Sequence, residues 1–239
     1  MKTNKKQSSP TPVSKKQLPV DPIVNSEPIT AKAGVSIYHL KVVLEGTKPL
    51  VWRRLQVPGN ANLGWLHAVL QVAMGWSNSH LHQFLFGDQV CSDPSSGLED
   101  NDPSVLDESK VILSDAIPNP KDKMTYEYDF GDSWNHKIIV EKILSADPAA
   151  SKVALCLDGA RACPPDDCGG VPGYADMLEI IKSPKHPEYE STREWLGDRF
   201  NPETFDLEKI NACLRKLKWP RSTESHLRKA LMERDDCQE

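Results

Sequence analysis

The sequence predicts an α+β fold, because segments with strand periodicity fill most of its first two thirds and helical segments follow them. Five segments are short and apolar or alternating, and one strongly apolar helical segment follows the second of them. A strand places alternate side chains on one face, whereas a helix repeats its apolar face every three or four residues. We therefore expect a mixed sheet of about five strands, one helix across it and a C-terminal helical annex.

Two strands open the part of the chain that we expect to be ordered. Residues 1–33 are rich in Lys, Ser, Thr and Pro and are too polar to offset the entropy cost of ordering, so a disordered basic tail is predicted there. Strands are predicted at 37–46 and 50–57. The second strand alternates, and Arg53 shares one face with its apolar residues.

A helix and a third strand follow. Asn62 can cap the helix and Gly75 can end it. The apolar positions between them form one stripe at helical spacing, made of Leu66, Val69, Leu70, Ala73 and Met74. The period of two returns over 80–86, where His80 and His82 share one face of the predicted strand.

A hairpin is predicted after a long polar segment. Residues 87–123 resemble an irregular excursion rich in Asp, Ser and Pro, with a short strand around 111–113. A loop of that length is often functional. Strands at 124–130 and 133–144 then form a hairpin that turns at a Gly-Asp pair.

Helices complete the predicted fold. They lie near 174–182, 188–197, 206–217 and 222–234, and Asp206 can cap the third of them. The predicted domain covers 34–217, with its sheet at about 36–145 and its helical annex at about 170–217, and a basic helix or tail follows at 218–239. One helix across a mixed sheet resembles a β-grasp arrangement.

Charge is distributed unevenly along the chain. The formal net charge is −5, but residues 88–136 carry a net −9, between basic ends of +4 at 1–33 and +6 at 209–234. This distribution suits a basic partner, an intramolecular contact or a cation site. The basic ends could also contact the phosphates of nucleic acid, although no helix-turn-helix or zinc-finger signature accompanies them.

The cytoplasm is the predicted compartment. No apolar run approaches the roughly 20 residues that span a bilayer, so no membrane partner is expected. The first residues also lack the apolar stretch of an export signal. Six cysteines in 239 residues are too few for a disulfide framework, and we expect reduced thiols.

The stretch ACPPDDCGG at 162–170 combines rigid, flexible and acidic residues. Its prolines fix the backbone, its glycines permit positive φ, and Asp166 and Asp167 can accept backbone N–H groups, including those of the next helix. We interpret it as a stiff clasp that packs the helical annex onto the hairpin. The resulting surface is predicted to bind a protein or peptide through Arg53, Trp76, His82, Tyr128, Asp129, Asp132, Trp134, His136, Asp166, Asp167 and Tyr174.

A metal site at the same place is the alternative. Cys156, Cys163, Cys168 and His136 could hold zinc, although the C-x6-C-x4-C spacing departs from the usual tighter pairs. Oxygen ligands for magnesium or calcium could instead come from Asp129, Asp132, Asp158, Asp166 and Asp167. Cys163 or Cys168 beside His136 and an aspartate could form a nucleophilic site, but the sequence contains no nucleophile elbow. It contains no phosphate-binding loop either. The sequence therefore favours a protein without catalysis and without a required cofactor.

Five phrases resemble a known family. In order, they are LVWRRLQVP, LHAVLQVAMGWSNSHLHQFLFG, YDFGDSWNHKI, CLDGARACPPDDCGGVPGY and FNPETFDLEKINACLRKL. Together they resemble the family named after open reading frame 3 of plasmid pRiA4b, from about Ile37 to Leu217. The resemblance implies an association with plasmids and mobile elements, and some members carry a transposon resolvase label. No nucleophilic serine with supporting arginines is recognisable here, so the label implies no mechanism.

Three functions are open at this point. The preferred one is a non-catalytic protein- or peptide-binding module associated with plasmid or mobile-element biology. The second is a metal-dependent, enzyme-like site with zinc or magnesium on the surface formed by DFGDSWNH and ACPPDDCGG. The third is an accessory DNA-binding protein of a mobile element.

Overall fold

An eight-stranded sheet forms the centre of the fold in the computed structural model, which describes residues 35–98, 102–146, 152–197 and 200–219. Its strands are β1 (Val35–Leu44), β2 (Trp52–Pro58), β3 (His82–Phe86), β4 (Gln89–Ser92), β5 (Leu106–Asp107), β6 (Lys123–Tyr128), β7 (Trp134–Ala146) and β8 (Leu155–Ala160). They lie in the order β5-β4-β3-β6-β7-β1-β2-β8. All neighbours are antiparallel except β4 and β5, so the sheet is mixed and the predicted α+β class is confirmed.

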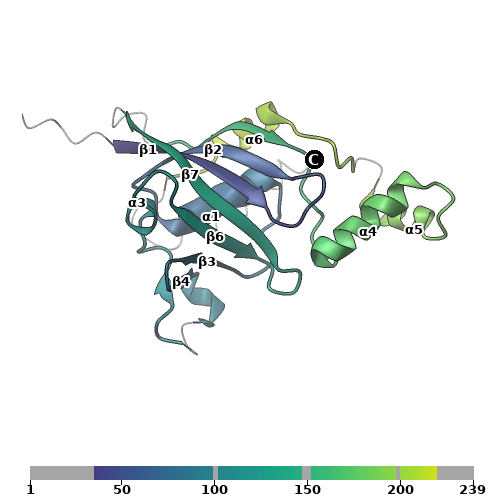
Figure 1. The fold of residues 1–239 in the computed structure, drawn as a ribbon, viewed down its shortest axis with the longest axis horizontal. Coiled ribbons are helices and arrows are strands. Elements are labelled where there is room, and N and C mark those ends of the chain that lie inside the picture. The colour runs from purple at the N-terminus through teal and green to yellow at the C-terminus, as the bar shows by residue number, and fades with distance from the viewer. Residues whose placement is uncertain (1–34, 99–101, 147–151, 198–199, 220–239) are drawn as a thin grey trace, which may run out of the picture. The chain divides into compact units, whose positions relative to one another are not determined.

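Helix α1 (Leu63–Met74) lies across one face of the sheet (Figure 1). Its predicted caps are confirmed, because Asn62 accepts a hydrogen bond from the backbone of Trp65 at 2.8 Å and Gly75 ends it with φ of +104°. All of its residues are buried, since α6 packs against it as well. Burial of one large apolar side chain contributes about 1.5–3 kcal/mol, so this helix anchors the core.

The strand faces follow the predicted alternation. Arg53, Leu55 and Val57 of β2 point into the core, while Trp52 and Arg54 are partly exposed. In β7 every second residue from Trp134 to Val140 is buried, and Tyr126 and Tyr128 of β6 face the same side. The two-residue period therefore determines which side chains meet α1.

The sheet is larger than the sequence predicts, with eight strands in place of about five. The segment expected to be irregular, 87–123, contains β4, a short helix η1 (Pro94–Ser96), β5 and α3 (Leu113–Ala116). The strand expected around 111–113 is wrong, because Ile112 forms only an isolated bridge with Asn62 and Leu113 begins α3. These elements are too short for periodicity to reveal, and β8 exists because it pairs with the edge of β2.

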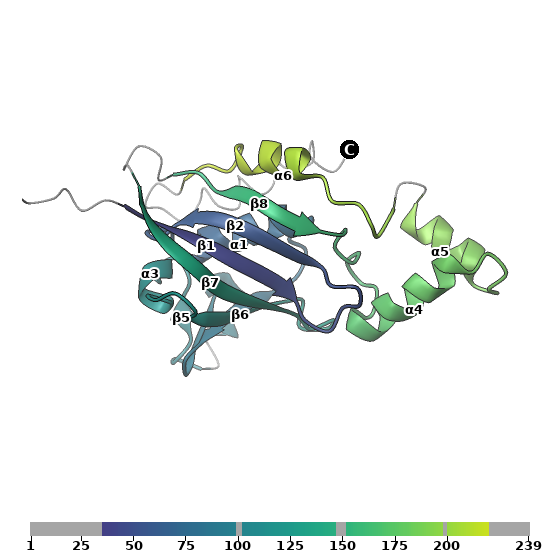
Figure 2. The same ribbon diagram turned by 45° about the horizontal axis from the view of Figure 1, so that its top comes forward.

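The helices of the annex are close to their predicted positions. They are α4 (Gly170–Lys182), α5 (Tyr189–Leu196) and α6 (Leu207–Leu214), and α4 begins earlier than expected. Asp206 caps α6 by accepting from the backbone of Lys209 at 2.8 Å. Figure 2 shows α6 beside β8. There the Asn211 amide bonds to both backbone groups of Cys156, at 2.8 and 2.9 Å, and so covers the sheet edge.

Some predictions are not tested by this fold. The tail at 1–33 and the helix at 222–234 lie outside the described residues, as does all of 218–239 except its first two residues. The β-grasp likeness stays a prediction. Among the helices that the structure describes, none combines the length and apolarity needed to cross a membrane.

Candidate functional site

The stretch at 162–170 packs directly against the hairpin of β6 and β7, as predicted. The indole N–H of Trp76 donates to the carbonyl of Pro164 at 3.0 Å, and the backbone N–H of Gly169 donates to Asp132 Oδ2 at 3.2 Å. The Trp76 ring also lies against Tyr128, with centroids 4.7 Å apart. Trp76 therefore links the end of α1, the hairpin and the 162–170 stretch.

The backbone at position 170 of this stretch requires glycine. Its φ is +66°, and a Cβ at this position would lie 2.6 Å from the backbone oxygen of Asp132. The aspartates of the stretch have another role than expected. No side chain caps α4, whose N-cap is Gly169, and Asp166 accepts from the hydroxyl of Ser77 at 2.7 Å.

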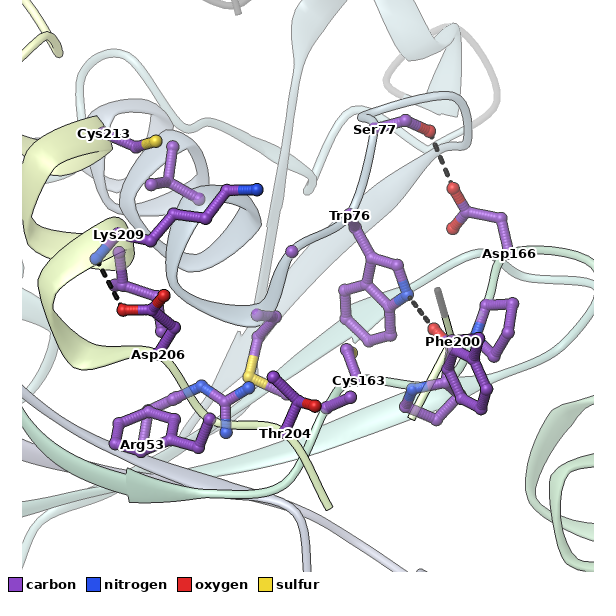
Figure 3. Close-up of a pocket in the computed structure, with 18 of the residues that line it drawn as sticks. Arg53, Trp76, Ser77, Cys163, Asp166, Phe200, Thr204, Asp206, Lys209 and Cys213 are labelled. Atoms are coloured by element: carbon purple, nitrogen blue, oxygen red, sulfur yellow. Dashed lines mark hydrogen bonds between the residues drawn. The ribbon is translucent and has the colours of Figure 1, made fainter. Parts of the chain in front are cut away.

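A cavity of about 550 Å³ opens beside this junction, between the end of α1, residues 162–166, residues 195–196 and residues 200–213 (Figure 3). Its apolar lining includes Met74, Trp76, Cys163, Pro164, Pro165, Trp195, Leu196, Phe200, Phe205 and Ile210. Figure 3 shows Asp166 and Ser77 on one side of it and Asp206 and Lys209 on the other. This size and this mixture of apolar walls with a few polar groups are typical of ligand sites.

Arg53 lines the cavity but is committed to the fold. Its guanidinium donates to the carbonyls of Ala73, Trp52, Ala160 and Arg161 at 2.7–2.9 Å, and only 2% of the residue is exposed. Burial lowers the pKa of this guanidinium. Arg53 therefore ties the end of α1 to β2 and β8, and is a structural residue rather than the exposed contact that the sequence predicts.

An acidic corner forms where Asp167 of the 162–170 stretch meets His80 and Asp129. His80 Nε2 is 3.4 Å from Asp167 Oδ1 and 3.7 Å from Asp129 Oδ2. Asp129 Oδ1 accepts from the backbone N–H groups of Gly131 and Asp132, at 2.9 and 3.3 Å, as expected for a turn. The sequence places His80 within the strand predicted at 80–86 and not at a site, whereas the strand begins at His82.

The predicted zinc ligands Cys156, Cys163, Cys168 and His136 do not come together. In the described residues, the one group of three or more ligand atoms within 4.8 Å of one another comes from the acidic corner and not from this set. Burial raises the pKa of all three thiols, to about 12 for Cys168, and so favours their protonated form. Burial also lowers the pKa of His136 to about 4, and its Nδ1 lies 3.1 Å from a backbone carbonyl.

Most of the predicted binding surface is also buried. Asp132, Asp166 and Asp167 are accessible, but less than a tenth of each remaining residue is exposed, namely Arg53, Trp76, His82, Tyr128, Asp129, Trp134, His136 and Tyr174. The aromatic residues among them join the layers of the fold, because large aromatic rings are most stabilising between packed elements. The sequence does not predict the cavity wall at 195–196 and 200–213, although the aromatic residues in this polar segment were an available signal.

A second cluster of titratable side chains is enclosed under α1. The His82 ring stacks on His67 with centroids 3.5 Å apart, and His82 Nε2 lies 2.8 Å from Glu108 Oε2. Burial lowers the pKa of His67 to about 3, lowers the pKa of His82 and raises that of Glu108. Burial thus disfavours the charged form of all three groups, and less than a tenth of each residue is exposed.

Comparisons with known proteins identify the family. The sequence model of the family described as plasmid pRiA4b ORF-3-like protein matches residues 36–209. An uncharacterised protein y4hQ of Sinorhizobium fredii is 35% identical over 190 residues, which cover 78% of this chain and 95% of that protein. The crystal structure of MM3350 from Methanosarcina mazei Go1, a protein of unknown function, is 38% identical with a TM-score of 0.65, and covers 73% of this chain and 97% of that one. The chain therefore belongs to the plasmid pRiA4b ORF-3-like protein family.

Proposed function

We propose that this chain is a non-catalytic binding module whose cavity receives apolar side chains of a partner polypeptide. The cavity beside Trp76 is the observation that carries this proposal. Its volume of about 550 Å³ is sufficient for one or two large side chains, and its walls include four aromatic rings and two prolines. Rings of this kind supply large contact area at low entropy cost.

The margins of the cavity favour a polypeptide over a purely apolar ligand. Trp195 lines the cavity and is 54% exposed, so a partner that covers this indole would gain apolar burial. Asp166 and Lys209 also contribute to the lining, and they offer an acceptor and a cation to a peptide that crosses the cavity. A buried apolar anchor with a polar rim is the usual anatomy of a protein interface.

The thiol at the cavity wall suits binding rather than nucleophilic chemistry. Burial raises the pKa of Cys163 well above the ordinary value, although the guanidinium of Arg53 opposes this shift. A protonated thiol is a weak nucleophile and behaves as a small apolar side chain.

The remaining parts of the sequence interpretation stay predictions. A role in plasmid or mobile-element biology depends on the family resemblance, and nucleic-acid binding depends on basic ends that lie mostly outside the described residues. The cytoplasmic location depends on sequence composition alone.

Peptide selection tests the proposed function. The full chain is used to select from a random phage-displayed peptide library, with counter-selection on Thr204→Trp, whose indole would fill the cavity that Thr204 lines. Asp176→Trp on the exposed face of α4 is the matched control. Selected peptides, measured by fluorescence anisotropy, should bind Thr204→Trp at least about tenfold more weakly and Asp176→Trp as tightly as the parent chain.

Two results would overturn the proposal. One is that no peptide is enriched on the parent chain over Thr204→Trp. The other is that enriched peptides bind both equally, which would locate peptide binding outside the cavity.

A further inference from the structure

The acidic corner brings one imidazole and two carboxylates together from three separate segments. His80 precedes β3, Asp129 follows β6, and Asp167 belongs to the 162–170 stretch. Their ligand atoms lie within 4.8 Å of one another. The contacts of Trp76 and Asp132 with the 162–170 stretch hold these segments in place, so the three donors are positioned by the fold.

One buried polar atom in this corner has no hydrogen-bond partner. His80 Nε2 is inaccessible to solvent and forms no hydrogen bond. The Asp129 side chain is only 9% exposed, and its backbone contacts occupy Oδ1, which leaves Oδ2 facing the His80 ring. A buried polar group without a partner is costly, and such a group facing other donors indicates a missing ligand.

The distances from His80 Nε2 to the two carboxylates match joint coordination of one ion better than they match direct hydrogen bonds. N–H···O hydrogen bonds measure about 2.7–3.2 Å, whereas His80 Nε2 lies 3.4 and 3.7 Å from the two carboxylates. Two ligand atoms about 2.0–2.2 Å from a tetrahedrally coordinated ion are about 3.3–3.6 Å apart. The separation of 3.4 Å falls in the range expected for two ligands of one ion, and the separation of 3.7 Å lies just above it.

The charges also favour a cation. Within the described residues, no Lys or Arg forms an ion pair with Asp129 or Asp167, and His80 is the basic group beside both. Asp132 and Asp166 add negative charge nearby, although each is used in a hydrogen bond to another group. An imidazole together with two carboxylates suits zinc-like ions, because magnesium and calcium prefer sites made of oxygen alone.

We propose that His80, Asp129 and Asp167 bind a divalent transition-metal ion of the zinc class. This inference goes beyond the proposed peptide binding and does not depend on it. Asp167 is 75% exposed on its side chain, so the proposed site lies at the surface of the molecule. The ion would tie the 162–170 stretch to the loop before β3 and to the turn between β6 and β7.

The test uses the full chain after treatment with EDTA, titrated with zinc chloride by isothermal titration calorimetry. One ion should bind per chain, and Asp167→Asn should bind at least about tenfold more weakly, because a charged ligand is lost at an exposed position that the fold tolerates. Asp129→Asn keeps Oδ1 for the turn and should show the same loss. His186→Ala, which removes an exposed imidazole elsewhere, is the control and should leave the affinity unchanged.

Cobalt separates this site from a thiolate site. The cobalt-loaded chain should show tetrahedral d–d absorption without thiolate-to-cobalt charge transfer, and a Cys163→Ser plus Cys168→Ser variant should bind zinc as the parent does. The proposal is overturned if the parent chain shows no saturable zinc binding. Zinc binding that survives Asp167→Asn, or that is lost with the two cysteines, would equally overturn it.

Discussion

Replacement of Arg53 by methionine should destabilise the fold severely although it removes no apolar contact area. The side chain is buried in β2, and its guanidinium donates four hydrogen bonds to backbone carbonyls. One of these carbonyls belongs to Ala73 in the last turn of α1, where the helix dipole also favours a cation. Methionine fills similar space but leaves all four carbonyls without this donor.

The magnitude follows from two opposing contributions. Hydrogen bonds to a charged group contribute about 1.5–3 kcal/mol each, which gives roughly 6–12 kcal/mol for four of them if they were additive. Burial of the guanidinium costs several kcal/mol, and methionine avoids this cost. We therefore expect Arg53→Met to lower the free energy of unfolding by about 3–5 kcal/mol.

The neighbouring residue provides a matched control. Arg54 points to the other face of β2, where it pairs with Glu141 at 2.6 Å and Asp158 at 3.1 Å and is 31% exposed. Exposed ion pairs contribute little, so Arg54→Met should cost about 1 kcal/mol or less. Guanidinium chloride unfolding of the parent and both variants, monitored by circular dichroism, measures the difference. Equal losses in the two variants, or a loss below about 1 kcal/mol for Arg53→Met, would refute the reasoning.

Two further predictions concern pH and backbone geometry. The pKa values of buried His67 and His136 are lowered from 6.5 to about 3 and about 4, so the unfolded chain binds protons first and stability falls as pH drops from 6.5 towards these values. Relative to pH 7, each of these two histidines should lower the free energy of unfolding at pH 5 by about 2 kcal/mol. The lowered pKa of His82 and the raised pKa of Glu108 have opposite effects on stability, which largely cancel. Denaturant unfolding at pH 7 and pH 5 measures this, and an unchanged free energy of unfolding would contradict it. Gly170→Ala should cost about 2 kcal/mol through its contact with Asp132. It should cost more than Gly87→Ala, where φ is also positive at +53° but no atom lies within 4 Å of the added Cβ, and equal melting temperatures of the two variants would argue against the close packing.

Much of the fold was predictable from local pattern. The alternation in β2 and β7 and the cap at Asn62 depend on residues adjacent in sequence, so periodicity and capping chemistry could reveal them. The contact between the 162–170 stretch and the hairpin was also predictable, because proline, glycine and aspartate suit a rigid turn. Strands such as β5 and β8 were not, since pairing at a sheet edge creates them and their own sequences carry little periodicity.

By itself, the sequence determined the α+β class, the order of the main elements and the junction between two distant segments. Only the tertiary structure decided which residues of that junction are accessible. It buried Arg53 and Trp134, which the sequence places at a surface, and it brought His80 to Asp129 and Asp167. The physical reason is that burial and ligand geometry depend on three-dimensional distances between remote segments, whereas the pattern of a sequence reports only the neighbours along the chain.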